Sequence, residues 1–226
     1  MVLLRIAWVN YLHLSFFEKV VLEIHQLSLN VLIFIIDKQI HGSQEALIMS
    51  RVEIPSRENT PPETHETLDA IGKRLGFFPN LYRLTAISPK ALAALVALQT
   101  PLMKALDLKT RERIALVVSE VNGCSYCVAA HTFVGLNLAK DSAEEIALAR
   151  KGQSSNPKTQ TILQFAERVA EMRGHVSEDE IDCVREAGFS DAEIIEVIGL
   201  VIQFSFTNYI NNVFDTDIDF PTDTLL

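Results

Sequence analysis

Helix start and stop signals follow one another from residue 61 onward, and they constrain the fold more than any other feature of the sequence. Ser, Asp and Asn residues of the capping type precede stretches with helical apolar spacing, and glycines end most of these stretches. Alternating apolar residues and hairpin turns, which predict strands, are nearly absent. We therefore predict an all-α fold of about eight helices, covering residues 63–75, 90–105, 107–121, 124–138, 142–151, 158–173, 177–187 and 190–214.

The first 48 residues differ in character from the rest of the chain. Uncharged, apolar runs cover residues 6–17 and 24–36, and each is shorter than the roughly 18 apolar residues that a membrane-spanning helix needs. The segment also lacks the small-residue cleavage site that closes a signal peptide. We interpret residues 1–48 as an N-terminal appendage that does not belong to the functional fold, and residues 49–226 as the functional domain.

Charge and cysteine content exclude several classes of protein. The formal net charge is -9, and the chain has no Lys/Arg-rich run of the kind that binds nucleic acid. Three cysteines in 226 residues do not make the disulfide framework of a small secreted domain. We therefore expect a cytoplasmic protein that has neither nucleic acid nor a membrane as its partner.

Two of the three cysteines lie in one short stretch with a histidine. Cys124 and Cys127 have the Cys-x-x-Cys spacing, and His131 follows four residues later, so a helix would present all three on one face. Gly123 is predicted to end the preceding helix, which puts the cysteines in the first turn of the next one. Unpaired backbone N–H groups and the helix dipole favour negative charge there and lower the pKa of a thiol. Because the thiolate is the reactive form, the stretch predicts redox chemistry, with His131 as a base near neutral pH.

The preceding helix offers two carboxylates as partners for this histidine. Glu112 and Glu120 are eight residues apart and fall on nearly the same helix face. Two antiparallel helices joined by a tight turn meet along their lengths, so Glu112 comes closer in level to His131 than Glu120 does. We predict that Glu112 orients His131, with Glu120 as the second choice.

Glu112, the Cys124–Cys127 pair and His131 resemble, in type and spacing, the core motif of the alkyl hydroperoxidase D-like branch of the carboxymuconolactone decarboxylase superfamily. The segments 78–82, 108–112, 119–124 and 211–221 also resemble that family, and the likeness covers about residues 50–221. It implies a multi-helical fold with the active site on a helical hairpin, assembled as a homo-oligomer, either a trimer or a hexamer. It further implies a peroxiredoxin-type antioxidant enzyme that reduces hydroperoxides, is recycled by a thiol or dithiol reductant, and uses no cofactor.

The resemblance also implies roles for the individual residues. Cys127 matches the peroxidatic cysteine, and Cys124 matches the cysteine that resolves the sulfenic acid as a disulfide. Glu112 and His131 match the residues that relay protons. Tyr126 stands where the best-known branch has a histidine, so it is a secondary candidate, expected as a wall of the pocket.

Other interpretations of the same residues stay open. Cys124, Cys127 and His131 could hold zinc together with Glu112 or water, although no second Cys/His pair is present. The chain could also be a lyase of the carboxymuconolactone decarboxylase type, or a non-enzymatic redox-sensing oligomeric scaffold. Cys183 is expected to be an inert thiol in the core.

Overall fold

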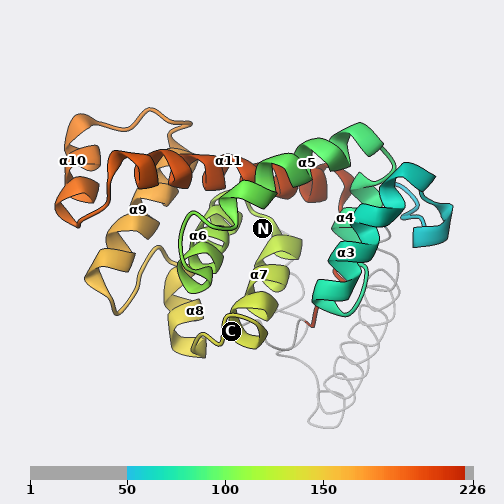
Figure 1. The fold of residues 1–226 in the computed structure, drawn as a ribbon. Helices are drawn as coiled ribbons and strands as arrows, with labels where there is room; N and C mark the ends of the chain where they lie inside the picture. Colours follow the sequence, from blue (N-terminus) through green and yellow to red (C-terminus); the bar gives the residue numbers. More distant parts are fainter. Residues whose placement is uncertain (1–49, 222–226) are drawn as a thin grey trace, which may run out of the picture. The chain divides into compact units, whose positions relative to one another are not determined.

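The structure is a computed structural model that describes residues 50–221 of the chain. This part consists of helices and contains no strand, so the predicted all-α fold class is confirmed. Two 3-10 turns, η2 (Arg57–Asn59) and η3 (Pro62–Thr64), come first. The α-helices are α3 (His65–Leu75), α4 (Asn80–Thr85), α5 (Pro89–Leu102), α6 (Leu108–Val121), α7 (Ser125–Asn137), α8 (Ala143–Ala149), α9 (Pro157–Glu171), α10 (Glu178–Glu186) and α11 (Asp191–Phe214) (Figure 1). Residues 1–48, which we interpret as an appendage, lie outside the described residues.

Local capping interactions explain why most helix starts could be predicted. Ser177 and Ser190 each form a full capping box, in which the Ser hydroxyl and the Glu three residues later accept each other's backbone N–H. Asp107 and Asn156 cap α6 and α9 by accepting one backbone N–H each. Each of these contacts spans only three residues, so the sequence pattern contains it.

Helix α4 is the described helix that the sequence pattern did not predict. It has six residues, too few for an apolar period to become visible. Its first backbone N–H, that of Asn80, donates to the Asp219 carboxylate at 2.7 Å, and the Asn80 side chain donates to the carbonyl of Asp217 at 2.8 Å. The start of α4 therefore depends on partners near the other end of the described chain.

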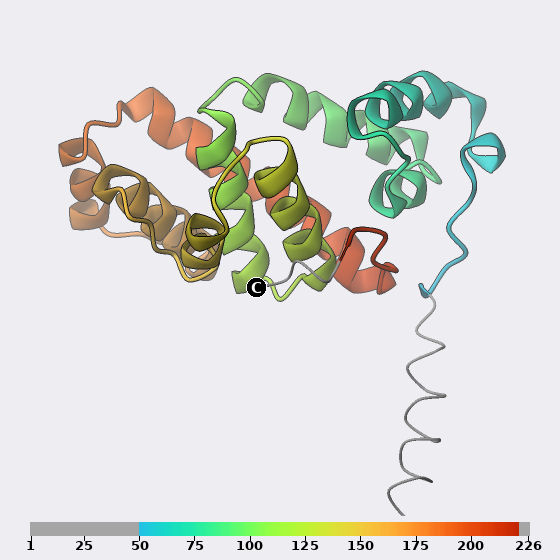
Figure 2. The same ribbon diagram turned by 90° about the horizontal axis from the view of Figure 1, so that it is seen from below.

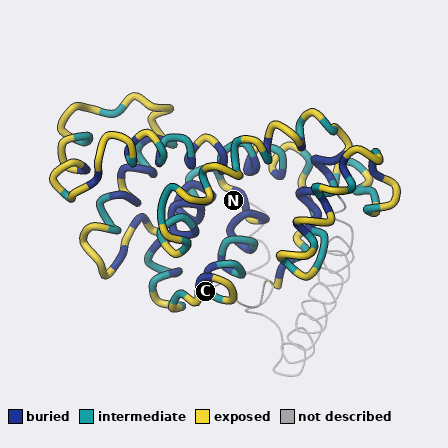
Figure 3. Tube along the Cα trace, viewed as in Figure 1, coloured by how far each residue is buried: buried dark blue, intermediate teal, exposed yellow. Residues whose placement is uncertain are grey.

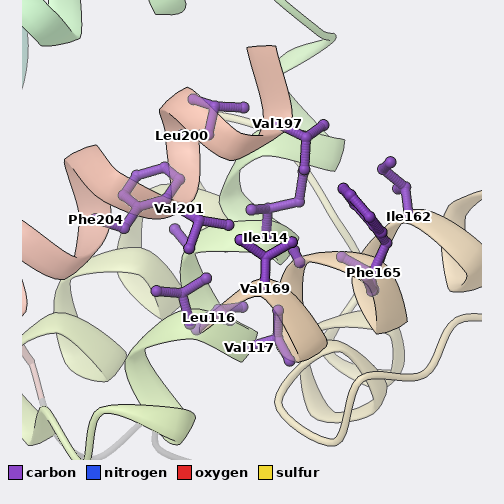
Figure 4. Packing of buried hydrophobic residues seen from close by; sticks show 14 of the residues in the cluster. Ile114, Leu116, Val117, Ile162, Phe165, Val169, Val197, Leu200, Val201 and Phe204 are labelled. Carbon is purple, nitrogen blue, oxygen red and sulfur yellow. The ribbon is translucent and has the colours of Figure 1, made fainter. Parts of the chain in front are cut away.

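Helix α6 forms the centre of the core. Its middle residues, from Ile114 to Val118, are almost completely buried, so α6 is enclosed all round rather than on one face (Figure 3). Helices α7, α8, α9 and α11 pack against it. Figure 4 shows its side chains Ile114 and Leu116 among those of α9 and α11. A helix held from several sides gives a rigid base for side chains that project from its ends.

Helix α11 is the longest described helix, with 24 residues, and it packs against α4, α5, α6, α7 and α9. Among residues 50–221 it is also the one helix long and apolar enough to cross a membrane. Its buried side chains, including Val197, Leu200 and Phe204, belong to the main hydrophobic core. We therefore interpret α11 as a core helix.

Helices α6 and α7 form a hairpin, and they lie side by side in both ribbon views (Figures 1 and 2). Gly123 closes the turn with a φ of 63°, a left-handed conformation that glycine adopts without strain. The Asn122 side chain donates to Asn208 Oδ1 at 2.9 Å and to Ser205 Oγ at 3.2 Å. Asn212 in turn donates to the Asn122 carbonyl at 2.8 Å. The turn is therefore fastened to α11.

The prediction that Cys183 is a core thiol is wrong. Cys183 lies on α10 and is exposed, whereas the next residue, Val184, is buried. Helix α10 covers the core with a single edge, and the apolar neighbours of Cys183 in the sequence fall on that edge instead. A cysteine beside apolar residues need not share their face of a helix.

Candidate active site

Both thiols of the Cys-x-x-Cys pair are buried at the start of α7. Cys124 is the N-cap residue, and its Sγ accepts the backbone N–H of Cys127 at 3.3 Å. The exposed fractions of Cys124 and Cys127 are 1% and 2%, and both thiols are free. The sulfur of Cys124 therefore takes the place that a Ser or Asp oxygen takes in an ordinary helix cap.

The two thiols differ in acidity. Hydrogen bonds from the Cys127 thiol and the Cys127 backbone N–H lower the pKa of Cys124 from its ordinary value, against the opposing effect of burial. Burial, followed by the hydrogen bond with Cys124, raises the pKa of Cys127 well above its ordinary value. The expected effect of the helix N-terminus is therefore found at Cys124 alone. In the reduced site Cys124 is therefore the more acidic of the two thiols.

An asparagine on α11 contacts Cys127. Asn211 Nδ2 donates to Cys127 Sγ at 3.2 Å, and Asn211 itself is 2% exposed. Its Oδ1 is buried and has no hydrogen-bond partner among the described residues. A buried acceptor without a partner costs free energy. In the reduced site Asn211 Oδ1 is therefore still able to accept one hydrogen bond.

A second asparagine holds the same face of α11 against the hairpin. Asn208 Nδ2 donates to Ser119 Oγ at 3.2 Å, while its Oδ1 accepts from Asn122. A hydrogen bond from Asn208 contributes to the lowered pKa of Cys124 and opposes the rise in the pKa of Cys127. Sequence reasoning missed Asn208 and Asn211 as site residues. The available signal was two asparagines three residues apart, and so on one face, in the second half of a long helix.

Glu112 of α6 and His131 of α7 meet across the hairpin. The Nδ1 atom of His131 lies 2.7 Å from Oε2 of Glu112, and their side chains are 20% and 11% exposed. An ionised carboxylate can only accept, so Nδ1 donates and Nε2 is left as the basic atom. The ring packs edge-on against Phe204, with centroids 5.2 Å apart. The structure thus brings together the two residues that the sequence paired.

No hydrogen bond within the described part of the chain joins His131 to either sulfur. Cys127 and His131 are nevertheless one helical turn apart on α7. A proton that passes between them therefore needs a bridging molecule, and a bound peroxide is suited to that position.

The two secondary candidates have structural partners elsewhere. Glu120 Oε1 accepts from Arg150 Nε at 2.5 Å, so the structure does not bring Glu120 to His131. The Tyr126 hydroxyl donates to Asp219 Oδ1 at 2.8 Å and accepts the Leu81 backbone N–H at 3.1 Å. Burial raises the pKa of Tyr126 and that of Asp219. Tyr126 therefore fixes the C-terminal segment against α7, and it also lines a cavity.

This cavity has a volume of about 380 Å³ and lies beside the Glu112–His131 pair. Side chains of α3, α5, α6, α7 and α11 line it. Of the residues predicted for the site, Glu112, His131 and Tyr126 contribute to its wall, whereas neither cysteine does. The ring of His131 is thus open to a ligand in the cavity, while the two cysteines do not line it.

The structure gives no support to the zinc alternative. Within residues 50–221, no three His, Cys, Asp or Glu side chains gather closely enough to hold a metal ion. Cys124 and Cys127 have each other and Asn211 as partners, and His131 has Glu112.

Fold and site together define an all-helical protein with a buried dithiol and a carboxylate–histidine pair on one helical hairpin. Residues 89–171, which run from the start of α5 to the end of α9, match the family model of the Carboxymuconolactone decarboxylase family. A search of the curated proteins gives no match.

Solved structures of this fold are similar over most of the described chain. A peroxidase-related protein from Ralstonia eutropha JMP134 with the alkylhydroperoxidase AhpD core has a TM-score of 0.70 and 23% identity, over 80% of this chain and 96% of that one. A peroxidase-related protein from Silicibacter sp. TM1040 has a TM-score of 0.67 and 22% identity, over 79% and 95%. The debrominase Bmp8, as a Cys-to-Ala variant in complex with 2,3,4-tribromopyrrole, has a TM-score of 0.67 and 20% identity, over 79% and 96%. The family model thus matches the part of the chain that holds the hairpin, and the solved structures share the fold of the described residues.

Proposed function

We propose that this protein is a thiol peroxidase that reduces organic hydroperoxides through Cys127 and Cys124. The observation that carries the proposal is the combination of a buried Cys-x-x-Cys pair with a Glu112–His131 pair one helical turn away. Dithiols in this setting react with peroxides because one sulfur, as it loses its proton, attacks oxygen and the neighbouring sulfur condenses with the product as a thiolate. The AhpD-core and peroxidase-related structures of the same fold support the same chemistry.

In the first step the Cys127 sulfur attacks one oxygen of the peroxide bond. Its proton passes through the bound peroxide, which bridges the two residues, to Nε2 of His131, an S–O bond forms, and the O–O bond breaks. The leaving alkoxide takes the proton back from His131 and departs as an alcohol. Cys127 is thereby oxidised to a sulfenic acid. Glu112 holds the ring in the tautomer that this proton transfer needs.

In the second step the Cys124 thiolate attacks the Cys127 sulfur. An S–S bond forms, the S–O bond breaks, and the hydroxide leaves as water after taking a proton. The lowered pKa of Cys124 suits this role, because it favours the thiolate that makes this attack. A thiol or dithiol reductant then returns both cysteines to the reduced form.

Asn211 stabilises the sulfenic acid of Cys127 by hydrogen bonds until Cys124 attacks. In the reduced state its Nδ2 donates to the Cys127 sulfur, and its Oδ1 has no partner in the described part of the chain. A sulfenic acid adds an O–H donor at that sulfur, which the free Oδ1 is positioned to accept. The amide then satisfies both of its polar atoms in the oxidised state alone.

We further propose a cytoplasmic homo-oligomer, with residues 1–48 outside the functional fold. Apolar side chains of α11 are exposed at heptad-like spacing, and they are Ile195, Ile202, Tyr209 and Val213. Such a stripe on a long helix is typical of a helix–helix contact between subunits. Trimers and hexamers are the assemblies that a mass measurement would distinguish.

Reductive dehalogenation is the second candidate function. The solved debrominase has this fold, and the cavity beside His131 is large enough for a halogenated ring. The same dithiol would supply the reducing electrons and end as a disulfide, while the halogen leaves as halide. A lyase reaction or a redox-sensing scaffold would use the same residues differently.

One set of assays separates these functions. Hydroperoxide consumption, bromide release from a bromopyrrole and decarboxylation are each measured with a dithiol reductant, for the wild type and for Cys127→Ser, Cys124→Ser and Glu112→Gln. We expect hydroperoxide consumption that Cys127→Ser abolishes. Peroxide turnover that survives Cys127→Ser would overturn the proposed function. Disulfide formation without turnover of any substrate would favour the scaffold.

A further inference from the structure

We propose that the cavity beside Glu112 and His131 binds a carboxylic acid with an apolar body. Resting on the proposed function, we infer that the peroxide substrate is the hydroperoxide of such an acid. The proposal is carried by an apolar wall and by two arginines of the cavity that have no carboxylate partner among residues 50–221.

The wall of the cavity is suited to an apolar ligand. Its volume of about 380 Å³ falls in the range of small-molecule sites. The apolar part of the wall comes from α3, α4, α5, α6, α7, α11 and their flanks, and it includes Leu75, Leu102, Met103, Leu108, Val134 and Leu138. Burying an alkyl chain or a ring there releases ordered water from both surfaces.

Arg74 and Arg111 bring positive charge to this apolar cavity. One nitrogen of Arg111 donates to the Leu106 carbonyl at 3.1 Å, and one nitrogen of Arg74 contacts the Met103 sulfur at 3.4 Å. A thioether sulfur is a weak acceptor, so most donors of both guanidinium groups are available.

Half of the arginines in the described chain are paired with carboxylates, and the two that line the cavity are not among them. Ion pairs join Arg57 to Asp69, Arg113 to Asp141, Arg168 to Glu180 and Arg185 to Asp191. No ion pair of Arg74 or Arg111 occurs within residues 50–221. In a chain with a net charge of -9, two such arginines in one cavity favour an anion as the ligand.

The charges of the two arginines act on each other. Burial, and the nearby positive charge of Arg74, lower the pKa of Arg111 from its ordinary value, and Glu112 and Asp107 oppose that change. A carboxylate bound at both guanidinium groups removes the repulsion, and the planar fork of arginine matches the geometry of a carboxylate. The single carboxylate of the cavity wall, that of Glu112, is already bound to His131.

The polar groups in the rest of the wall are neutral. They include the Tyr82 hydroxyl, which is hydrogen-bonded to Gln99, and the Gln203 side chain. A ligand anchored by its carboxylate therefore lays its apolar body along the wall that also contains His131. That arrangement offers a distant peroxide group to the basic ring, while the anionic end stays at the arginines.

Binding is tested first without any chemistry, on the full-length Cys127→Ser protein. Calorimetry compares octanoate with octan-1-ol, which has the same chain without the charge. We expect octanoate to bind at least about tenfold more tightly, because hydrogen bonds to a charged group are stronger than neutral ones. Equal binding of acid and alcohol, or no binding of octanoate, would overturn the proposal.

Arginine variants test where the carboxylate binds. Arg74→Gln and Arg111→Gln should each weaken octanoate about tenfold, while octan-1-ol is unaffected. Arg111→Lys keeps the charge but loses the planar fork of the guanidinium group, so an intermediate loss of octanoate affinity is expected. A folding defect caused by Arg111→Gln would show as a loss in that variant that Arg111→Lys does not share. Arg185→Gln on α10 is the matched control and should change nothing. Losses of the same size in Arg185→Gln would contradict the assignment.

Activity forms a separate arm of the experiment. A fatty-acid hydroperoxide is compared with its methyl ester, and kcat/KM for the free acid should be about tenfold higher in the wild type, with the difference lost in Arg111→Gln. Octanoate binding without any peroxidase activity would leave the binding site standing and remove the proposed function. Peroxidase activity with equal kcat/KM for acid and ester would leave the proposed function standing and overturn the proposed carboxylate site.

Discussion

The thiol site and the cavity are neighbouring regions of one helical hairpin, but different kinds of side chain surround them. The thiols lie against asparagines of α11 and are 1% and 2% exposed, whereas the cavity is lined by apolar side chains, two arginines and the Glu112–His131 pair. Helix α7 contributes residues to both. The proposed ligand binding and the proposed thiol chemistry therefore depend on different residues of the hairpin, so each should respond to its own substitutions.

The largest expected effect tests the thiol side. Cys127→Ser should lower hydroperoxide turnover by about 10³-fold or more, because it removes the nucleophile itself. Cys124→Ser should stop turnover but still allow one equivalent of peroxide to react. Trapping with dimedone and mass spectrometry should then find the sulfenic acid at Cys127. A sulfenic acid found at Cys124 in the wild type would mean that Cys124 attacks the peroxide and Cys127 resolves the sulfenic acid.

Glu112→Gln sharpens the boundary between the two regions. The amide cannot accept the Nδ1 proton in the same way as a carboxylate, so we expect a loss in kcat of about 10²-fold. Octanoate binding should be retained, since Glu112 is not its ligand. A pH profile of kcat is the decisive readout, because a merely structural role would lower activity without moving the profile.

Asn211→Leu should have a smaller effect, of about tenfold, on the lifetime of the Cys127 sulfenic acid in the Cys124→Ser background. The variant removes both hydrogen bonds but keeps a similar volume. Asn212→Leu is the matched control, since Asn212 is exposed and binds the Asn122 carbonyl instead of a thiol. Unchanged lifetimes in Asn211→Leu would show that the amide has no part in holding the oxidised sulfur.

The two thiols should titrate in a fixed order. A thiol loses its proton as pH rises, so Cys124, with its lowered pKa, should become reactive below the ordinary thiol range and Cys127 above it. The rate of alkylation by iodoacetamide, followed for each peptide by mass spectrometry from pH 5 to 10, gives both curves. Coinciding curves would contradict the asymmetry of the pair.

The smallest effect is expected outside both regions. Cys183→Ser changes an exposed side chain on α10, so the free energy of unfolding should change by less than about 0.5 kcal/mol and turnover should not change. Denaturant unfolding and the peroxidase assay measure the two quantities.

The hairpin could be predicted from sequence because its determinants are local. Gly123 ends α6, Cys124 caps α7, and the antiparallel geometry that follows puts Glu112 level with His131. The asparagines of α11 could not be predicted in the same way. Asn211 is 84 residues from Cys127, and nothing in the periodicity of α11 says which other helix that face will meet.

Long-range partners also account for the remaining misses. Glu120, the second candidate to orient His131, instead pairs with Arg150, thirty residues later in the chain. Helix α4 begins at a carboxylate 139 residues away. Cys183 has apolar neighbours in the sequence, but the packing of α10 through one edge leaves the thiol outside. Each of these outcomes was decided by tertiary packing, which overrides local preference.

The contact between Tyr126 and Asp219 has a consequence for synthesis of the chain. The cysteine pair leaves the ribosome long before its partners, because Asn211 and Asp219 lie 84 and 93 residues beyond Cys127 and Tyr126. Until α11 and the segment after it have been made, Cys124 and Cys127 have neither the helix that encloses them nor the amide that contacts sulfur. A nascent chain therefore carries two unprotected thiols, and their burial is among the last events of folding.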